Sequence, residues 1–476
     1  MEELLHVSIA DVGPAHAETD VLVVGFGAAG TCAAHAAREA GAEVIALERT
    51  AGAGGAAALA EGIIYLGGGT PVQRACGFED SVENMVAYLM AACGPEPDEA
   101  KVRAYAEGSL EHFDWLVERG VEFDGRLDVE TQMAPRDTHG LVWSGGENAW
   151  PFSDLATPAP RGHLAKTKNA TGWLLMKTLA EACAAIGVEA VFDTRATALV
   201  VDGDRVVGVV ASSYGEERVY LARRGVVLTA GGFIWNDDML RRHAPTLLRG
   251  TWKVGTEADD GRAIEMAQSV GARVKNMHVG EVSLPIIPPR ELVQGIIVNG
   301  HGQRFINEDT YMGRVGQAAL YEQDATCFLV VDEAAYQPNW MGLTATWVCE
   351  TTAELEAEMG LPAGSLEATV DLYNRHAAEH EDPLFHKASE WVRPLVPPLG
   401  AFDLRPGVAP YAPFTLGGLE TRVTGEVVSL QGDVVPGLFA AGRTTSGICS
   451  FGYASGLSIG DSTMFGRFAG RRAAAG

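Results

Sequence analysis

Residues 21–48 read VLVVGFGAAGTCAAHAAREAGAEVIALE, and this stretch decides the fold. An apolar strand leads into a Gly-x-Gly-x-x-Gly turn at 25–30, a helix over 28–40, a second strand over 44–47 and the acid Glu48. Strand, glycine turn, helix, strand and acid in this order are the fingerprint of a dinucleotide-binding unit. The stretch therefore predicts an α/β domain built on a parallel sheet.

Each residue of the fingerprint has its own task. Gly25 permits the tight turn, Gly27 lets the backbone approach a pyrophosphate, and Gly30 lets the helix pack closely on the sheet. The helix then points its N-terminus at the phosphates. A carboxylate at Glu48 suits a ribose 2′-hydroxyl and repels a 2′-phosphate, so we expect FAD or NAD and not NADP.

Composition and charge exclude several classes of protein. The chain has 476 residues, of which 47% are hydrophobic, so two domains are expected. Its 62 acidic and 36 basic residues give a net charge of −26, which disfavours nucleic acid and anionic membranes as partners. The first 20 residues lack a basic segment followed by an apolar one, and no sustained apolar span follows. We expect a cytoplasmic protein without membrane insertion.

The seven cysteines form no C-x-x-C pair. Iron–sulfur, haem and zinc sites therefore lack their usual spacing, and no metal is expected. A second strand–GxGxxG–helix unit is also missing, which disfavours a reductase that binds NAD(P)H in a domain of its own. Electrons must then pass from the cofactor to an external acceptor.

The character of the chain changes along its length. The glycine-rich run 52–69 is expected to fold around the cofactor, with a flexible loop as the alternative, and 126–160 to be a surface excursion without assigned chemistry. Aromatic residues and prolines are frequent over 277–412. We predict a discontinuous cofactor domain formed by 1–276 and 413–476, with a catalytic domain at 277–412.

Four separated blocks resemble one family, the FAD-dependent fumarate reductases and 3-ketosteroid dehydrogenases. They are the fingerprint, VVLTAGGF at 226–233, NGHGQRFINED at 299–309 and GLFAAGRTTSGICSFGYASGLSIGDSTMFGRFAG at 437–470. The resemblance implies a Rossmann-like FAD domain interrupted by a smaller α+β catalytic domain, with the substrate at their interface. Covalent members attach FAD through a histidine after the fingerprint. No histidine lies between His35 and His112, so non-covalent FAD is expected.

From the fingerprint and the resemblance together we expect the cofactor to contact one set of residues. They are Gly25, Gly27, Ala28, Ala29, Gly30, Glu48, Arg49, Gly55, Ala56, Gly231, Gly442, Arg443, Gly456, Leu457, Ser458 and Asp461.

Two positions separate the members of this family. Fumarate reductases place an arginine four residues after the Glu of an Asn-Glu pair, and a histidine before a Thr-Met-Gly-Gly-Leu run. This chain has Met312 and Phe414 there. An apolar side chain cannot repay the desolvation of a carboxylate. Arg314 is close enough in sequence to substitute, so a fumarate-like enoate reductase stays an alternative.

Tyr311, Tyr453 and Ser455 are the expected catalytic residues. The Tyr-Ala-Ser triplet at 453–455 resembles the Δ4-(5α) type of 3-ketosteroid dehydrogenase. The Δ1 type has a Tyr-Pro-Gly-Pro-Gly motif, which is absent, so it is the second choice. The resemblance implies a hydrophobic 3-ketosteroid as substrate.

The chemistry of desaturation explains why hydroxyl groups suit this site. A proton leaves the α-carbon of the ketone and a hydride leaves the β-carbon for the flavin. Tyr453 is expected to take the proton with Tyr311 as a relay, while Ser455 and the amides of 452–456 hold the carbonyl oxygen.

Competing interpretations remain at this point. Tyrosines are often packing residues, and Ser455 is also a candidate N-cap of the last helix. Arg161 and His163 are weaker candidates for polarising the substrate, and Arg304 is expected to shape its loop.

Overall fold

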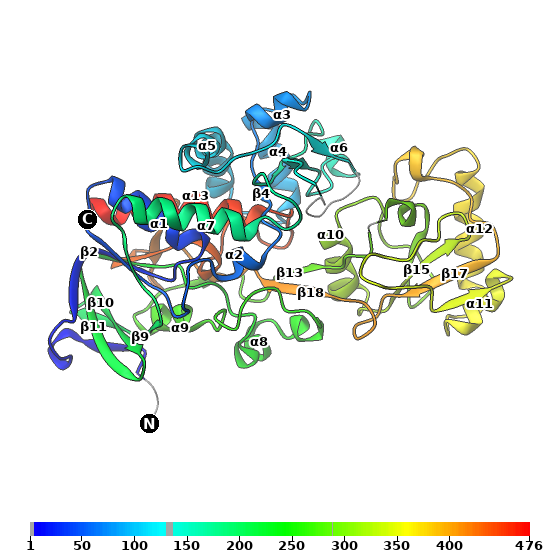
Figure 1. Cartoon of the computed structure of the whole chain (residues 1–476). Coiled ribbons are helices and arrows are strands. Elements are labelled where there is room, and N and C mark those ends of the chain that lie inside the picture. Colours follow the sequence, from blue (N-terminus) through cyan, green and yellow to red (C-terminus); the bar gives the residue numbers. More distant parts are fainter. Residues whose placement is uncertain (1–3, 130–136, 288) are drawn as a thin grey trace.

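The computed structural model describes residues 4–129, 137–287 and 289–476 (Figure 1). Within this part, a nine-stranded sheet forms the centre of the larger domain. Its strands run in the order β1 (His6–Ser8), β9 (Thr194–Asp202), β10 (Arg205–Ser213), β11 (Glu216–Leu228), β2 (Ala17–Val24), β3 (Val44–Leu47) and β8 (Glu189–Val191), while β21 (Val434–Ala440) pairs with both β11 and β20 (Glu426–Val428).

The pairing of the strands confirms the predicted parallel core. β11, β2, β3 and β8 pair in parallel, and β21 pairs in parallel with β11. β10 is antiparallel to β9 and to β11, so these three strands form two successive hairpins. The first half of β11 closes the second hairpin with β10, and its last residues pair in parallel with β21.

Helices α1 (Ala28–Glu39) and α13 (Leu457–Ala475) pack side by side above this sheet in Figure 1, next to α7 (Gly172–Ala185). Small residues allow a close approach. A Cβ added to Gly466 would lie 2.4 Å from the Ala29 carbonyl oxygen, and one added to Gly470 would lie 2.0 Å from that of Ala33. α8 (Asp237–His243) and α9 (Arg262–Ser269) lie lower than these helices in the same view, and α9 packs against β9.

The segment after the fingerprint forms a smaller layer at the top of Figure 1. It contains α3 (Pro71–Ala75), α4 (Val82–Ala92), α5 (Glu99–Glu118), α6 (Phe152–Leu155) and the short strands β4 (Ile64–Tyr65), β5 (Leu127–Asp128), β6 (Leu141–Val142) and β7 (Gly162–His163), while α2 (Gly55–Leu59) lies below them against α7. The predicted surface excursion at 126–160 therefore also contributes the strands β5 and β6 and the helix α6 to this layer, and its residues 130–136 lie outside the described residues.

The second domain lies to the right in Figure 1. Its antiparallel sheet has the order β14 (Ile296–Asn299), β15 (Cys327–Asp332), β17 (Leu399–Asp403) and β16 (Trp347–Cys349), with α11 (Thr352–Glu358) and α12 (Ser365–Ala377) beside it. The chain enters through β13 (Gly280–Ser283) and returns through β18 (Ala412–Thr415), and α10 (Met312–Gln317), which lies between β14 and β15 in sequence, packs against β13. A two-stranded pair, β12 (Val274–Lys275) with β19 (Gly418–Leu419), lies close to this crossing in sequence.

The Rossmann-like α/β fold, interrupted by a smaller α+β unit, is thus confirmed. The exact boundaries at 277 and 412 stay a prediction. They fall beside the β13–β18 pair, where two chain segments cross together between the two units.

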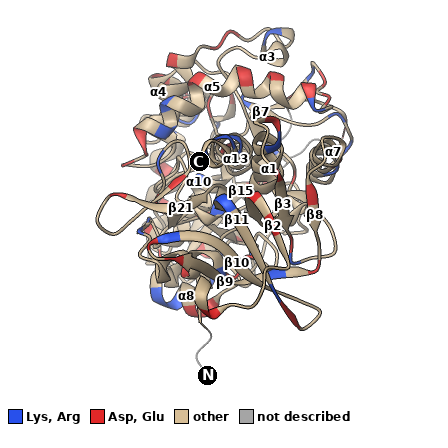
Figure 2. Cartoon of the chain, turned by 90° about the vertical axis from the view of Figure 1, so that its left-hand side faces the viewer, with Lys and Arg blue, Asp and Glu red and all other residues tan. Residues whose placement is uncertain are grey.

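Acidic and basic residues are interspersed along the chain. Figure 2 shows both kinds on the helices and loops of the viewed side, α5 included. No helix in the described part of the chain combines the length and the apolar composition needed to cross a bilayer. The described residues also contain no cluster of three or more His, Cys, Asp or Glu able to hold a metal.

Candidate active site

A cavity of about 710 Å³ lies where the two units meet. The cavity is bordered by the carboxyl ends of β2 and β11, by the N-termini of α1 and α13, and by β13 and β18. The three expected catalytic residues line it, as do most of the expected cofactor residues: Gly25, Gly27, Ala28, Ala29, Glu48, Arg49, Gly55, Ala56, Gly231, Gly442, Arg443, Gly456 and Ser458. Gly52, Ala53 and Gly54 line it too, as expected for the glycine-rich run.

Three expected cofactor residues do not line the cavity. A Cβ on Gly30 would lie 1.9 Å from the Gly25 carbonyl oxygen, so this glycine serves the packing of α1 on the turn. Leu457 is part of the apolar core. The Asp461 carboxylate accepts a hydrogen bond from the Ile448 N–H (3.0 Å), and burial raises its pKa to about 6. A helical segment that follows a glycine turn exposes only one face to the cavity, so the cofactor contacts expected of Leu457 and Asp461 stay a prediction.

The glycine turn leaves room for a phosphate group. A Cβ on Gly27 would find no protein atom nearer than the Gly54 carbonyl oxygen at 3.6 Å, so the packing of the protein does not require a glycine here. Gly27 is the N-cap of α1, where no side chain caps the helix. The space beside it belongs to the cavity. Free N–H groups at a helix terminus beside open space fit a pyrophosphate.

Glu48 is fixed at the edge of the same cavity. Its Oε2 atom accepts a hydrogen bond from the Phe26 N–H (2.9 Å), and its Oε1 atom accepts bonds from the N–H and the hydroxyl group of Thr50 (2.9 Å each). A carboxylate has about four acceptor positions, so it retains capacity for a ribose hydroxyl. This geometry fits the role expected of Glu48.

Arg443 is held in place by Asp259. Its Nη2 atom lies 3.0 Å from both carboxylate oxygens of Asp259. Asp259 also accepts hydrogen bonds from the N–H groups of Gly232 (3.0 Å) and Thr256 (2.9 Å). A Cβ on Gly231 would lie 2.1 Å from Asp259 Oδ1, which explains the glycine at that position. The guanidinium group faces the cavity with its charge already paired.

Tyr453 lies at the N-terminus of α13. Its hydroxyl oxygen accepts a hydrogen bond from the Ser458 N–H (2.9 Å) in the first turn of the helix. Its ring makes edge contact with Phe414 at a centroid distance of 5.3 Å. Desolvation raises the pKa of this phenol, and the Ser458 N–H and the Arg443 charge oppose that rise without cancelling it. The residue is therefore a neutral phenol whose proton is available for donation.

Ser455 lines the cavity but does not cap the helix, so the capping alternative is wrong. The N-cap of α13 is Gly456, whose φ of 96° suits glycine. The Ser455 N–H donates to the Ser144 carbonyl oxygen (2.9 Å), so this amide is not free to bind a substrate carbonyl. The 126–160 segment thus helps to position Ser455, a task that the sequence analysis did not assign to it.

Tyr311 is paired with a residue that the sequence analysis missed. Its hydroxyl group donates to Oε1 of Glu281 (3.1 Å), a carboxyl group on β13 that is 1% exposed and lines the cavity. Tyr311 and Tyr453 lie near each other, with ring centroids 6.5 Å apart. Glu281 is a single acid inside the apolar run 277–289. An isolated acidic residue in an apolar run was the sequence feature that could have identified Glu281 as a site residue.

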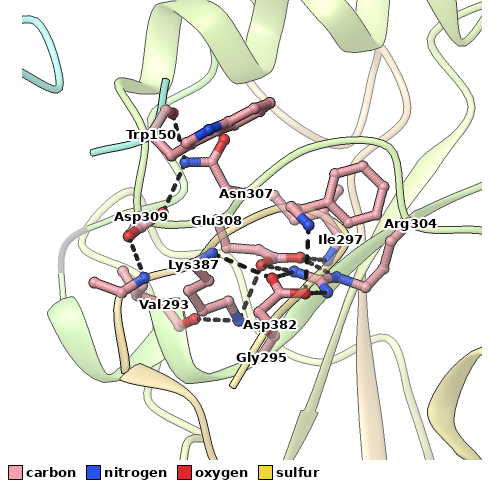
Figure 3. A network of polar contacts seen from close by, with 12 residues as sticks. Trp150, Val293, Gly295, Ile297, Arg304, Asn307, Glu308, Asp309, Asp382 and Lys387 are labelled. Carbon is pink, nitrogen blue, oxygen red and sulfur yellow. Dashed lines mark hydrogen bonds and ion pairs between the residues drawn. The ribbon is translucent and has the colours of Figure 1, made fainter. Parts of the chain in front are cut away.

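A buried network holds the loop that carries Tyr311 (Figure 3). Arg304 pairs with Glu308 (2.7 Å) and with Asp382 (2.8 Å), and Lys387 also pairs with Glu308 (2.9 Å). The Asp309 carboxylate accepts a hydrogen bond from the Ala388 N–H (2.9 Å). The network clamps residues 304–309, so Arg304 shapes its loop as expected.

The residues considered for other substrates are engaged elsewhere. Arg161 pairs with Asp80 (2.7 Å) in a fully buried ion pair, and His163 contacts Thr70 (2.8 Å). Neither lines the cavity, so both candidates for polarising the substrate were wrong.

Arg314 is outside the cavity lining as well. Its Nη1 atom donates to the Trp150 carbonyl oxygen (3.2 Å) and to Asn307 Oδ1 (2.9 Å). Met312 and Phe414 do line the cavity, so apolar groups stand at the two positions that serve a dicarboxylate in fumarate reductases.

Comparisons with known proteins agree with this geometry. The family model described as an FAD binding domain matches residues 20–458. Among curated proteins, the chain is 28% identical to a 3-oxo-5-alpha-steroid 4-dehydrogenase of Comamonas testosteroni, over 92% of this chain and 95% of that protein. It is 29% identical to a probable fumarate reductase of Shewanella frigidimarina, over 96% of this chain and 75% of that one.

A solved structure is more similar. The 3-ketosteroid-Δ4-(5α)-dehydrogenase of Rhodococcus jostii RHA1, in complex with 4-androstene-3,17-dione, is 49% identical and superposes with a TM-score of 0.95 over 99% of both chains. Together with the matched family model, this shows that the chain belongs to the FAD binding domain family and that its cofactor is FAD.

Proposed function

We propose that the protein is an FAD-dependent 3-ketosteroid Δ4-(5α)-dehydrogenase, which removes two hydrogens across C4–C5 of a 3-keto-5α-steroid. The observation that carries this proposal is the convergence of three hydroxyl groups, those of Tyr453, Tyr311 and Ser455, on one cavity with apolar residues beside them. The similarity to the Rhodococcus enzyme supports the same assignment. FAD, when bound, supplies the acceptor for a hydride.

The geometry suggests a division of labour among the hydroxyl groups. The Tyr453 hydroxyl oxygen accepts a hydrogen bond from the Ser458 N–H, so the hydroxyl proton is free to point at a substrate carbonyl. Negative charge develops on that carbonyl oxygen as the α-proton leaves, and the bond from Tyr453 strengthens with it. The Ser455 hydroxyl lines the same cavity and is positioned as a second donor. Tyr453 then acts as an oxyanion donor, whereas the sequence suggested a base.

Tyr311 suits the proton path better than Tyr453 does. Its hydroxyl group already donates to a carboxyl group, so it can accept a proton from the substrate as it gives up its own. A phenol without such a partner is a poor base because its ordinary pKa is about 10.

The charges of the cavity argue against a dicarboxylate substrate. Arg49 and Arg195 both pair with Asp260, at 2.8 and 3.0 Å, and Arg443 pairs with Asp259. An anion placed beside Met312 and Phe414 would lose its hydration without gaining a cation, which costs several kcal/mol. A fumarate-like enoate reductase is therefore the weaker alternative, and the Δ1 type lacks a supporting motif.

Two further features belong to the proposal. FAD is bound non-covalently, since no histidine lines the cavity among the described residues. The reduced enzyme passes its electrons to an external acceptor, because the described residues contain no group of three or more His, Cys, Asp or Glu that could hold a second redox centre.

The direct test is anaerobic reduction of the purified enzyme by a saturated 5α-3-ketosteroid, followed by product analysis. Bleaching of the flavin absorbance with a C4–C5 double bond in the product supports the proposal. A product desaturated at C1–C2 would move the enzyme to the Δ1 type. Rapid re-oxidation of the reduced flavin by fumarate, without reduction by any 3-ketosteroid, would support the enoate reductase instead.

A further inference from the structure

Glu281 is a buried acid that lacks a cationic partner, unlike Glu308 and Asp80. Glu308 pairs with Arg304 and Lys387, and Asp80 pairs with Arg161. No described Lys, Arg or His forms an ion pair with Glu281, and its Oε2 atom has no hydrogen-bond partner among the described residues. Burying a carboxyl group in this way costs free energy, and no ion pair compensates for the cost. Such an arrangement at a cavity points to a function.

We propose that Glu281 accepts the proton that leaves the α-carbon of the substrate, receiving it through the hydroxyl group of Tyr311. This inference deepens the function proposed above and rests on it. It assigns the end of the proton path to a residue on β13, on the wall of the cavity where Tyr311 also lies.

The contact geometry provides the path. The Tyr311 hydroxyl group donates to Glu281 Oε1 at 3.1 Å, within reach for direct proton transfer. A Cβ on Gly313 would lie 1.9 Å from Glu281 Oε1 and 2.3 Å from Tyr311 Cε1. The glycine in the first turn of α10 is therefore what allows the tyrosine and the carboxyl group to meet.

The proton passes from the α-carbon to Glu281 in two linked transfers. The C–H bond at the α-carbon breaks, its electron pair stays on the substrate as the enolate, and its proton binds the Tyr311 oxygen. The original Tyr311 proton moves to the Glu281 carboxylate, which becomes a neutral acid. The hydride that leaves the β-carbon goes to FAD, as the proposed activity requires, and the enolate electron pair forms the new double bond.

The surroundings of Glu281 tune it for this task. The titratable groups that face Glu281 are Tyr311 at the N-cap of α10, Tyr453 just before α13, Tyr321 and Cys449. None of them is cationic. Burial raises the pKa of Glu281 to about 8, while the hydrogen bond from Tyr311 opposes the rise. Glu281 is then protonated at low pH and becomes an acceptor as the pH passes about 8. The flavin reduction rate should increase over the same range.

The test is the isosteric variant Glu281→Gln, studied by stopped-flow flavin reduction with a 5α-3-ketosteroid between about pH 6 and pH 10. The amide still accepts a hydrogen bond from Tyr311 but cannot take up its proton. We expect FAD and steroid binding to be retained and the reduction rate to fall at least about 100-fold, with loss of the increase near pH 8. Glu281→Asp, which keeps a carboxyl group with a shorter reach, should recover part of the rate. Glu322→Gln, at an exposed acid of the same domain, is the matched control and should keep the wild-type profile.

A second readout separates this inference from the proposed function. The C=O stretching band of a protonated carboxylic acid, followed by infrared spectroscopy of the resting holoenzyme, should titrate near pH 8 in the wild type and be missing in Glu281→Gln. If no 3-ketosteroid reduces the wild-type enzyme, the proposed function fails whatever this band does. A Glu281→Gln variant with a wild-type rate and pH profile, or a wild-type enzyme without the band at low pH, would overturn the role of Glu281 itself.

Discussion

Replacing Tyr453 with phenylalanine tests the centre of the proposed site. The change removes one hydroxyl group and keeps the ring that contacts Phe414 at 5.3 Å and Tyr311 at 6.5 Å. The cavity therefore keeps its shape, and FAD and steroid should still bind. The chemical step, in contrast, loses the donor that stabilises the enolate oxygen.

The magnitude follows from the contacts of that hydroxyl group. Loss of one preorganised oxyanion donor lowers the rate by about 10²–10³. The Ser458 N–H also loses its acceptor at the start of α13. That loss resembles removal of a helix cap, so the free energy of unfolding should fall by about 0.5–2 kcal/mol. The variant remains folded because the rest of α13 is buried against α1.

The assay is stopped-flow flavin reduction by a 5α-3-ketosteroid, combined with the pH profile of the rate. If Tyr453 is the donor, Tyr453→Phe is slow but keeps the increase near pH 8 that belongs to Glu281. If Tyr453 is instead the base, that increase disappears. Tyr336→Phe removes a phenol outside the cavity lining and serves as the control. A Tyr453→Phe rate within a few-fold of the wild type would refute both roles.

Four further changes test the remaining parts of the site. Gly27→Val should yield apoprotein, because its Cβ makes no contact with the protein closer than 3.6 Å and its side chain enters the space beside the N-terminus of α1; full FAD retention after purification would contradict the phosphate cradle. Glu48→Ala should weaken FAD binding mildly, as flavin fluorescence titration would show, and an unchanged affinity would mean that the acid does not bind the ribose. Ser455→Ala should slow flavin reduction by about 10²–10³ if its hydroxyl group is an oxyanion donor, and a wild-type rate would remove it from the mechanism. Gly313→Ala should separate Tyr311 from Glu281 and give the pH profile of Glu281→Gln with FAD still bound, whereas an unaltered profile would show that the contact is dispensable.

The sequence by itself determined the larger part of the fold. The fingerprint at 21–48 predicts a strand, turn, helix and strand because each depends on residues that are close along the chain. Helix α1 and strand β3 lie within one residue of their predicted positions. Most expected cofactor residues line the cavity for the same reason, since a glycine turn and the helix start that follows it are local features.

Local pattern was insufficient where one face of an element had to be distinguished from the other. Leu457 and Asp461 belong to α13, as expected, but do not line the cavity. Ser455 was a plausible N-cap by residue type, yet the backbone places Gly456 at that position. A sequence pattern gives the element, whereas the neighbouring elements decide which face is covered.

Only the tertiary structure decided the partners of the reacting groups. Tyr311 meets Glu281 across 30 positions of sequence, and Arg443 meets Asp259 across 184. The Tyr453 hydroxyl oxygen accepts a hydrogen bond from the Ser458 N–H only because the chain turns at Gly456. The acidity of a phenol or a carboxyl group depends on burial and on the charges around it. Those surroundings come from segments distant in sequence, so residue type identified the candidates, and packing determined which groups donate and accept protons.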